Sequence, residues 1–371
     1  MRSTRLTIDM RAIAHNARAL RGAVRESARL MAVVKANAYG HGDIATAKTA
    51  LANGCDCLAV AFAQEGALLR DAGISAPILI LGTPEPETLR DVVELDLQQT
   101  AFLPEHIRML EDAASRAGKR ASVHIKIDTG MSRIGVAGGA LDELARAALD
   151  SRLVCVKGAY THFAAADGDG ADDEAFTRDQ IDAFQKAALP LRRMFPHIML
   201  HASNSAAALR YPEAAFDCVR VGIALYGAPP VSTAVPLRQA MRWSTRASYI
   251  KEIGGGACVG YGRTFRASGR TRVMTLPVGY ADGYHRALSN RGFVLIRGRR
   301  APLVGRVCMD QCMADITEIP EAEIGDEVVL LGAQREDAIG ADELGAWAGT
   351  ISYEIFCAPS ERVPRVVIPD A

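Results

Sequence analysis

The sequence carries no net charge, because 43 lysines and arginines are balanced by 43 aspartates and glutamates. A chain without a basic excess lacks the field that attracts nucleic acid or anionic membranes, so we exclude both as its main partner. No apolar run approaches the roughly 18 residues of a membrane-spanning helix. Hydrophobic residues make up 49% and charged residues 23% of the chain, values typical of a globular protein with a large buried core.

Cysteine is too sparse for a disulfide scaffold, since only eight are scattered along 371 residues. The close pairs, Cys55 with Cys57 and Cys308 with Cys312, have no second pair or histidine cluster nearby to complete a zinc site. We therefore expect reduced thiols and no metal site. The N-terminus has neither a continuous apolar core nor a small-residue cleavage site, so it does not predict a signal peptide, and the expected location is cytoplasmic.

Short runs rich in Val, Ile and Leu alternate with helical stretches between about residues 28 and 228. Near-continuous apolar strands separated by helices indicate a parallel sheet covered by helices. Eight strands over roughly 200 residues fit a closed α/β barrel of the TIM type better than an open sheet. The predicted strands lie in residues 29–36, 55–62, 76–82, 97–102, 121–128, 152–163, 197–204 and 216–227.

The pattern changes after the proline-containing segment "GAPPVSTAVPLR", which is a plausible linker. Beyond it, strands bounded by glycines dominate, with one helix expected at 340–350. We place an α/β barrel in residues 1–232 and a mainly β domain in residues 233–371. The first ten residues alternate like a strand and are a candidate to pair with the β domain. The acidic segment 166–175 is expected to be a solvated loop.

Polar residues follow several of the predicted barrel strands. Catalytic groups of such barrels sit at the carboxyl ends of strands and in the loops after them. Two lysines, two histidines and two arginines at one barrel face would suit an anionic ligand. The residues at these strand ends are Lys35, Asn37, Tyr39, Lys126, Asp128, Arg133, His162, His201, Asn204, Ser205, Arg220, Gly222 and Ile223.

Three of these residues suggest a cofactor. Lys35, in "AVVKANAYGHG", is either a solvent-facing residue at a strand end or a partly desolvated amine that acts as a nucleophile or Schiff-base partner. Ser205 begins a helix after the seventh strand, and Gly222 allows close backbone approach after the eighth, where barrels commonly bind phosphate. An N-cap and a packing glycine would explain each alone. Together with a lysine, they favour pyridoxal 5'-phosphate.

The ordered motifs resemble those of the alanine racemases, a fold-type-III family of pyridoxal-phosphate enzymes. The resemblance covers the whole chain. The motifs are "AVVKANAYGHG", "KIDTGMSRIG", "THFAAAD", "HASNSAA", "RVGIALYG", "VGYGRTF", "PVGYADGY", "GRVCMDQCM" and "TISYEI".

The resemblance implies roles for individual residues. Lys35 would carry the cofactor, and Lys35 and Tyr280 would be the two acid–base groups. Arg220 would hydrogen-bond the pyridine nitrogen, and His201 would link Arg220 to the rest of the site. Lys126 matches a lysine that is often carbamylated in the family and orients Arg133. The other implied residues would surround the cofactor and the substrate. His162 would lie beneath the ring, and the residues around the phosphate would be Tyr39, Asn204, Ser205, Gly222, Ile223 and Tyr353. Arg133 and the backbone of Met309 would hold the substrate carboxylate, with Asp310 in support.

The resemblance also implies a reaction and an assembly. The enzyme would interconvert L- and D-alanine, supplying D-alanine for peptidoglycan, as a homodimer in which Tyr280 and Met309 complete the partner's site. Racemisation needs one base on each face of Cα, which a lysine and a tyrosine can provide. Three alternatives stay open: a broader-specificity racemase, a same-fold amino-acid decarboxylase, and a non-catalytic pyridoxal-phosphate carrier. The donor-only guanidinium of Arg220 disfavours the decarboxylase, because it leaves the pyridine nitrogen unprotonated.

Overall fold

The computed structural model describes residues 2–370, which divide into two compact units. One unit contains residues 13–38 and 42–237, and the other contains the residues up to 12, residues 39–41 and the residues from 238 onward. The main division, between residues 237 and 238, falls a few residues after the expected boundary at 232. Each unit is described separately below.

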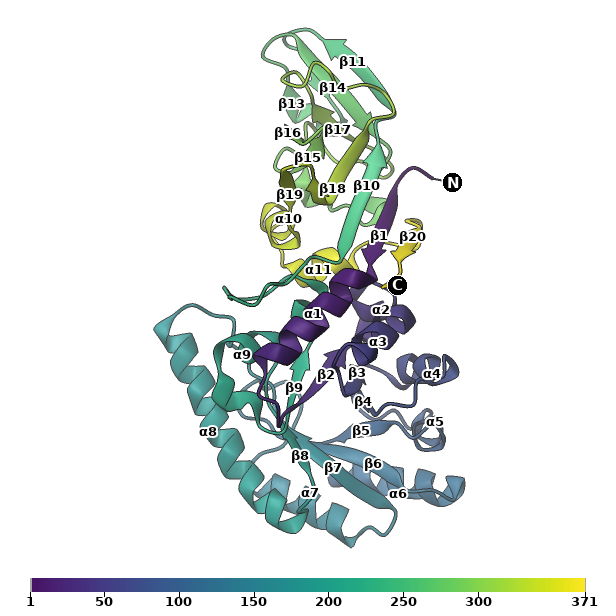
Figure 1. The fold of residues 1–371 in the computed structure, drawn as a ribbon, viewed down its shortest axis with the longest axis vertical. Helices are drawn as coiled ribbons and strands as arrows, with labels where there is room; N and C mark the ends of the chain where they lie inside the picture. Colours follow the sequence, from purple (N-terminus) through teal and green to yellow (C-terminus); the bar gives the residue numbers. More distant parts are fainter. Residues whose placement is uncertain (1, 371) are drawn as a thin grey trace. The chain divides into compact units, whose positions relative to one another are not determined.

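The first unit contains a closed barrel of eight parallel strands, β2 to β9 (Figure 1). The predicted TIM-type α/β barrel is confirmed, and each strand lies within one of the eight predicted runs. The strands are β2 (Arg29–Val33), β3 (Cys57–Val60), β4 (Ile78–Ile80), β5 (Gln98–Ala101), β6 (Ala121–Lys126), β7 (Val154–Tyr160), β8 (Met199–His201) and β9 (Cys218–Val221).

Helices lie between these strands, as the alternating pattern predicts. They are α3 (Asp43–Ala52), α4 (Ala63–Asp71), α5 (Leu89–Glu94), α6 (Pro104–Ala117), α7 (Gly139–Asp150), α8 (Ala171–Met194) and α9 (Ser205–Arg210). In α6, Pro104 occupies the first turn and Gly118 ends the helix in the left-handed conformation, which is the usual asymmetry of helix ends. Its buried residues Ile107, Leu110 and Ala114 recur at three- and four-residue spacing, so one face of the helix is buried.

One expectation for the barrel is wrong in part. The acidic segment 166–175 is not entirely a loop, because α8 begins at Ala171. Asp172, Asp173 and Glu174 form the first turn of this helix, where negative side chains interact favourably with the helix dipole. The charges that suggested a solvated loop therefore stabilise a helix start.

An unusual turn follows β2. Residues Lys35–Tyr39 form the short helical segment α2, but Ala36, Asn37, Ala38 and Tyr39 have φ between 51° and 53°. This is a single turn of left-handed helix built without glycine. Left-handed helical conformation costs an L-residue roughly 1–2 kcal/mol, so the turn persists only because its surroundings hold it.

The second unit is mainly β. Its largest sheet has the order β16-β15-β18-β10-β1-β20, with β19 paired to β18. The N-terminal strand β1 (Arg5–Asp9) pairs antiparallel with β10 and parallel with β20. The sheet's other strands are β10 (Met241–Arg246), β15 (Phe293–Ile296), β16 (Arg299–Pro302), β18 (Glu327–Gln334), β19 (Asp337–Ile339) and β20 (Arg365–Ile368).

Two smaller sheets complete this unit. One has the order β11-β14-β17, from Tyr249–Ile253, Thr271–Leu276 and Cys312–Asp315, and the other pairs β12 (Cys258–Val259) with β13 (Phe265–Arg266). Val259, Val273 and Val304 form a buried cluster among them. The helices α10 (Ala341–Ala348) and α11 (Ser352–Cys357) follow, so the segment 340–350 is helical as expected. One further helix, α1 (Met10–Ala23), connects β1 to the barrel.

All eight cysteines are free thiols. Within residues 2–370, no helix combines the length and apolar character that crossing a bilayer requires. Across the same residues, no three His, Cys, Asp or Glu side chains are grouped so that they could hold a metal ion.

Candidate active site

Three neighbouring barrel strands end in polar or aromatic side chains that lie side by side. Lys126 ends β6, Tyr160 ends β7 and His201 ends β8. The strand register pairs Lys126 with Tyr160 and Tyr160 with His201. All three side chains are nearly or fully buried. The predicted gathering of strand-end residues is therefore present for Lys126 and His201, with Tyr160 between them.

Arg220, in β9, is the central cation of this end of the barrel and is 3% exposed. Its guanidinium donates to Nδ1 of His201 at 2.8 Å and to the carbonyl oxygens of Thr161 and Ala202 at 2.9 and 2.8 Å. It also lies 3.2 Å from Nδ1 of His162. Burial lowers the pKa of Arg220 to about 10, so it stays protonated at neutral pH and acts only as a donor.

The histidines beside Arg220 are held neutral. Burial, followed by the nearby charge of Arg220, lowers the pKa of both His162 and His201 well below the ordinary value. Because Arg220 can only donate, Nδ1 of His201 must accept, which leaves the proton of this neutral ring on Nε2. The site therefore has a buried guanidinium and, beside it, one imidazole of defined tautomer.

The ring of Tyr160 lies close to both Lys126 and Arg220. Its ring is stacked on His201, with centroids 4.8 Å apart and planes 4° from parallel. Both Nζ of Lys126 and the guanidinium carbon of Arg220 lie 5.3 Å from the centre of the tyrosine ring. At these distances the ring face attracts the guanidinium of Arg220 and also the amine of Lys126 whenever that amine is protonated.

Lys126 is a buried amine with few partners. Its Nζ donates to the carbonyl oxygen of Ile127 at 2.9 Å. Burial, the charge of Arg220 and the charge of Arg133 lower its pKa to about 7, against the opposing effect of Asp128. A substantial fraction of Lys126 is therefore an uncharged nucleophilic amine at neutral pH.

The loops after β8 and β9 meet at Ser205. Its Oγ accepts hydrogen bonds from the amides of Gly222 at 2.9 Å and Ala224 at 3.3 Å. Asn204 caps α9 by accepting from the amide of Ala207 at 3.0 Å. Ser205 Oγ therefore joins the two loops and keeps its own O–H for an acceptor such as a phosphate oxygen, with Ile223 between the two amides that it binds.

Lys35 begins the left-handed turn and is half-buried. Glu65, in the first turn of α4, holds this turn: one carboxylate oxygen accepts from the amide of Ala36 at 2.7 Å and the other from the amide of Ala61 at 2.7 Å. The charge of Lys35 contributes to lowering the pKa of His162, which places the amine near the Arg220 group.

The second unit contains the remaining predicted residues in two groups. Tyr39 and Tyr353 have ring centroids 6.1 Å apart, so the two tyrosines assigned to the phosphate are neighbours. The amide of Tyr280 donates to the carbonyl oxygen of Cys308 at 3.0 Å, and that of Ala281 to Met309 at 3.0 Å. Tyr280 and Met309 are 43% and 53% exposed.

Asp310 pairs with Arg362 at 2.7 Å. Arg362 also lies 3.5 Å from Asp282, which is in the same short turn as Tyr280. Asp310 is therefore part of the charged network around Tyr280. Arg133, by contrast, is exposed in the loop after β6, and its proximity to the site is indicated through its effect on the pKa of Lys126.

Sequence reasoning missed His124 and Tyr160. His124 lies two residues before Lys126 in β6 and is fully buried. Alternate residues of a strand share a face, so the spacing was a usable signal for His124. Tyr160 ends β7 but lies inside the predicted run 152–163, from which the strand-end criterion selected His162 instead.

Comparison with known proteins matches both units to one family. Residues 8–230 match the family described as alanine racemase, N-terminal domain, and residues 240–367 match alanine racemase, C-terminal domain. An alanine racemase of Symbiobacterium thermophilum is 44% identical over 370 residues, covering 98% of this chain and 97% of that protein. Alanine racemase 2 of Caldanaerobacter subterraneus is 42% identical, covering 99% and 95%.

Solved structures agree with the sequence matches. Alanine racemase from Streptomyces coelicolor has a TM-score of 0.94 and 36% identity, covering 99% of this chain and 98% of its own. Alanine racemase from Bacillus anthracis, solved with bound L-Ala-P, has a TM-score of 0.91 and 34% identity, covering 99% and 95%. The resemblance to the alanine racemases that the motifs indicated is confirmed, and so is the predicted class of enzyme, an isomerase acting on amino acids. With both of its units matched and relatives similar along nearly their whole length, the chain belongs to the alanine racemase family.

Proposed function

We propose that this chain interconverts L- and D-alanine with pyridoxal 5'-phosphate, using Lys35 and Tyr280 as acid–base groups. The family is pyridoxal-phosphate-dependent. The observation that carries the proposal for this chain is the buried guanidinium of Arg220, fixed by His201, Thr161 and Ala202, two residues before the amide of Gly222 that binds Ser205.

The residues present fit the cofactor. Within residues 2–370, Nε of Arg220 makes no hydrogen bond, so one donor of a buried guanidinium remains for a ring nitrogen. The amine of Lys35 suits covalent attachment of an aldehyde. The residues that would bind the cofactor are Lys35, Tyr39, His162, Asn204, Ser205, Arg220, Gly222, Ile223 and Tyr353.

When bound, pyridoxal phosphate makes the Cα proton of an attached amino acid more acidic. The chain's own task is then to remove that proton from one face and return it to the other. We assign Lys35 to one face and Tyr280 to the opposite face, because inversion requires two bases. The guanidinium of Arg133 and the backbone of Met309 would hold the substrate carboxylate and so orient Cα between them.

The charge of Arg220 supports racemisation over the alternatives. A donor-only group cannot supply a proton to a ring nitrogen at accessible pH, so it limits how far negative charge spreads into the ring. Decarboxylation and amino transfer both benefit from that spreading, whereas racemisation needs only a short-lived charge at Cα. Arg220 therefore favours return of the proton over loss of another group.

Lys126 would support Arg133. Its lowered pKa leaves a reactive neutral amine, which can combine with carbon dioxide to form a carbamate. That change would replace a cation with an anion and turn the repulsion between Lys126 and Arg133 into attraction. Arg133 would then be held in place to receive the substrate carboxylate.

We also propose that the active form is a homodimer with shared sites, in which Tyr280 and Met309 of one copy act with Lys35 of the other. The exposure of Tyr280 and Met309 supports this proposal, since exposed aromatic and methionine side chains are enriched at interfaces between proteins.

The test is a deuterium-exchange assay. Purified protein loaded with pyridoxal phosphate is incubated with L-alanine in deuterated water, and D-alanine and Cα deuterium are measured by chiral chromatography and mass spectrometry. We expect both to appear together. Exchange without inversion, release of carbon dioxide, or cofactor binding without exchange would each contradict the proposal. A panel of other L-amino acids measures the breadth of specificity.

A further inference from the structure

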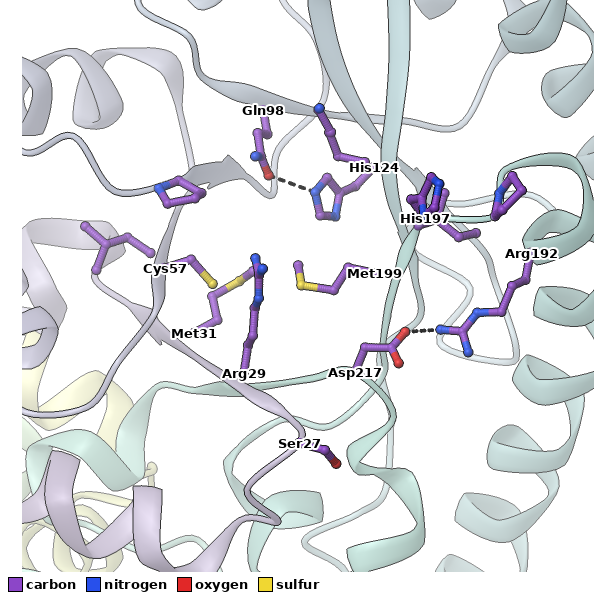
Figure 2. A pocket seen from close by; sticks show the side chains of 15 residues that line it. Ser27, Arg29, Met31, Cys57, Gln98, His124, Arg192, His197, Met199 and Asp217 are labelled. Atoms are coloured by element: carbon purple, nitrogen blue, oxygen red, sulfur yellow. Dashed lines mark hydrogen bonds and ion pairs between the residues drawn. The ribbon is translucent and has the colours of Figure 1, made fainter.

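A cavity of about 380 Å³ lies at the amino-terminal ends of the barrel strands (Figure 2). Its lining includes Arg29, Cys57 and Gln98, which are the first residues of β2, β3 and β5. The candidate active-site residues instead end their strands. The cavity is therefore at the opposite end of the barrel, and His124 also lines it.

A row of hydrogen bonds leads from this cavity to Arg220. Oε1 of Gln98 lies 2.8 Å from Nε2 of His124, a contact visible in Figure 2. Nδ1 of His124 lies 2.9 Å from Nε2 of His201, and Nδ1 of His201 accepts from Arg220 at 2.8 Å. Four side chains from four strands thus connect the two ends of the barrel.

The direction of every bond in this row follows from Arg220. A guanidinium only donates, so Nδ1 of His201 must accept. His201 is neutral, so its proton is on Nε2 and is donated to Nδ1 of His124. Burial, then the charges of Arg220 and Lys157, lower the pKa of His124 to about 3, so this ring is neutral too. Its proton is therefore on Nε2, where only an acceptor can meet it.

Gln98 supplies that acceptor, because its amide oxygen faces the ring. If the amide nitrogen faced His124 instead, both imidazoles would have to reverse, and the proton of His201 would then point at the N–H of Arg220. The row is therefore complete only when the oxygen of the Gln98 amide faces His124, because only then do Arg220, His201 and His124 all meet an acceptor.

His124 occupies a space shaped for it. A Cβ atom on Gly158 would lie 2.4 Å from Nδ1 and 2.6 Å from Cε1 of the His124 ring. The pairing of β6 with β7 also shifts register between Val123 and His124. An alanine at position 158 could not coexist with the ring in its present position, so the barrel wall itself accommodates this imidazole.

We propose that Gln98 is a positioning residue for Arg220, acting through His124 and His201. The Gln98 oxygen gives the Nε2–H of His124 its acceptor, so the two tautomers that Arg220 requires leave no donor of the row unpaired, and Arg220 keeps its remaining donor directed at the cofactor. This inference rests on the proposed function only in its last step. The tautomers themselves are a property of the chain.

The first test is nitrogen-15 NMR of the holoenzyme with labelled histidine, assigned by single histidine substitutions. Nitrogen shifts distinguish a ring protonated on Nε2 from one protonated on Nδ1. We expect His124 and His201 both to carry the proton on Nε2. A proton on Nδ1 of His201 in the native protein overturns the proposal without any variant.

The second test compares Gln98→Met with Gln99→Met. The first variant keeps the side-chain length and removes the acceptor. The second changes the adjacent glutamine, whose amide donates to the carbonyl oxygens of Gly82 and Thr100. We expect Gln98→Met to give His124 a mixture of tautomers and to lower kcat about tenfold, the usual effect of losing one hydrogen bond, with the KM for alanine within about twofold. Gln99→Met should leave the histidine shifts unchanged.

Gly158→Ala provides a second route that leaves Gln98 unaltered, because its Cβ atom would collide with the His124 ring and also with the carbonyl oxygen of Met199 at 2.7 Å. It should change the His201 tautomer and kcat in the same direction as Gln98→Met. Altered tautomers with native kcat, or lowered kcat with native tautomers, would overturn the positioning role. Should the native protein fail to racemise alanine, the proposed function falls, while the tautomer measurement still decides the hydrogen-bond row.

Discussion

Arg2 and Asp282, 280 residues apart in the chain, form a two-pronged ion pair in the second unit. The two guanidinium nitrogens donate to the two carboxylate oxygens at 2.5 and 2.8 Å. The Asp282 side chain is fully buried and also accepts from the amide of Gly279 at 3.0 Å. The turn that carries Tyr280 is therefore held by a residue at the start of the chain.

We expect Arg2→Ala to lower the free energy of unfolding of the second unit by about 1–2 kcal/mol, because the buried Asp282 carboxylate loses its main partner. Both tryptophans of the chain, Trp243 and Trp347, belong to this unit, so tryptophan fluorescence during urea unfolding reports on it. Arg5→Ala, at an exposed position in the same segment, should change stability by less than about 0.5 kcal/mol. Equal effects of the two variants would contradict the assignment.

The same ion pair gives a pH dependence. Burial raises the pKa of Asp282, but the hydrogen bonds from Arg2 and Gly279 outweigh burial and lower it below the ordinary value. A carboxyl with a lowered pKa in the folded state stabilises the fold above its unfolded pKa, about 3.9, and loses that contribution as pH falls. The stability difference between native protein and Arg2→Ala should thus be constant near neutrality and shrink below about pH 4. A difference that persists at lower pH would contradict this origin.

Gly279→Ala should separate Tyr280 from Met309. A Cβ atom at this position would lie 2.2 Å from the carbonyl oxygen of Cys308 and 2.4 Å from that of Met309, so the two backbone segments would have to move apart. We expect at least a tenfold loss of racemase activity with unchanged cofactor absorbance, because Lys35 belongs to the other unit. Gly254→Ala, where a Cβ atom would meet nothing within 4 Å, is the control and should be active.

Mixing inactive variants tests the shared site. We expect Lys35→Ala and Tyr280→Phe each to racemise poorly, whereas a mixture under subunit exchange should recover about a quarter of native activity. Half the dimers are then mixed, and each has one intact pair of bases. Mixing Lys35→Ala with the double variant Lys35→Ala/Tyr280→Phe should recover nothing. If labelled subunits exchange and activity does not return, both bases come from one chain.

Carbon-13 NMR tests the proposed carbamylation of Lys126. In protein incubated with carbon-13 bicarbonate, we expect a protein-bound carbamate signal that increases as pH rises through about 7, where the amine loses its proton. Lys126→Ala should remove the signal. Lys157→Ala, which changes an exposed lysine of the same barrel, should retain it. A signal that survives in Lys126→Ala would assign the carbamate to another amine.

In the left-handed turn, replacing an alanine with glycine should stabilise the fold, which is the reverse of its usual effect in a right-handed helix. We expect Ala36→Gly to raise the free energy of unfolding of the barrel by about 0.5–1 kcal/mol, because relief of roughly 1–2 kcal/mol of strain exceeds the entropy that glycine adds to the unfolded chain. Ala175→Gly, in the exposed interior of α8, should lower it by about 1 kcal/mol. Thermal unfolding followed by far-ultraviolet circular dichroism compares the two, and a destabilised Ala36→Gly would refute the strain.

Periodicity was enough to predict the barrel, because strands such as β3 and β4 are buried on both faces and are short continuous apolar runs. Strand ends were enough to predict Lys126, His201 and Arg220 as neighbours. The sequence could not predict the left-handed turn, because no glycine marks residues 36–39 and the turn depends on Glu65, which is remote in sequence. Nor could it predict that Gln98 contacts His124, since that contact depends on how adjacent strands are staggered.

The turn that carries Lys35 also constrains the order in which the protein can fold. Four consecutive left-handed residues cost on the order of 4–8 kcal/mol in isolation, so this segment cannot act as a nucleus and is unpopulated in a collapsed but unpacked chain. It can form only after α4 has brought Glu65 against the end of β2. Lys35 therefore reaches its place in a nearly finished barrel, late in folding.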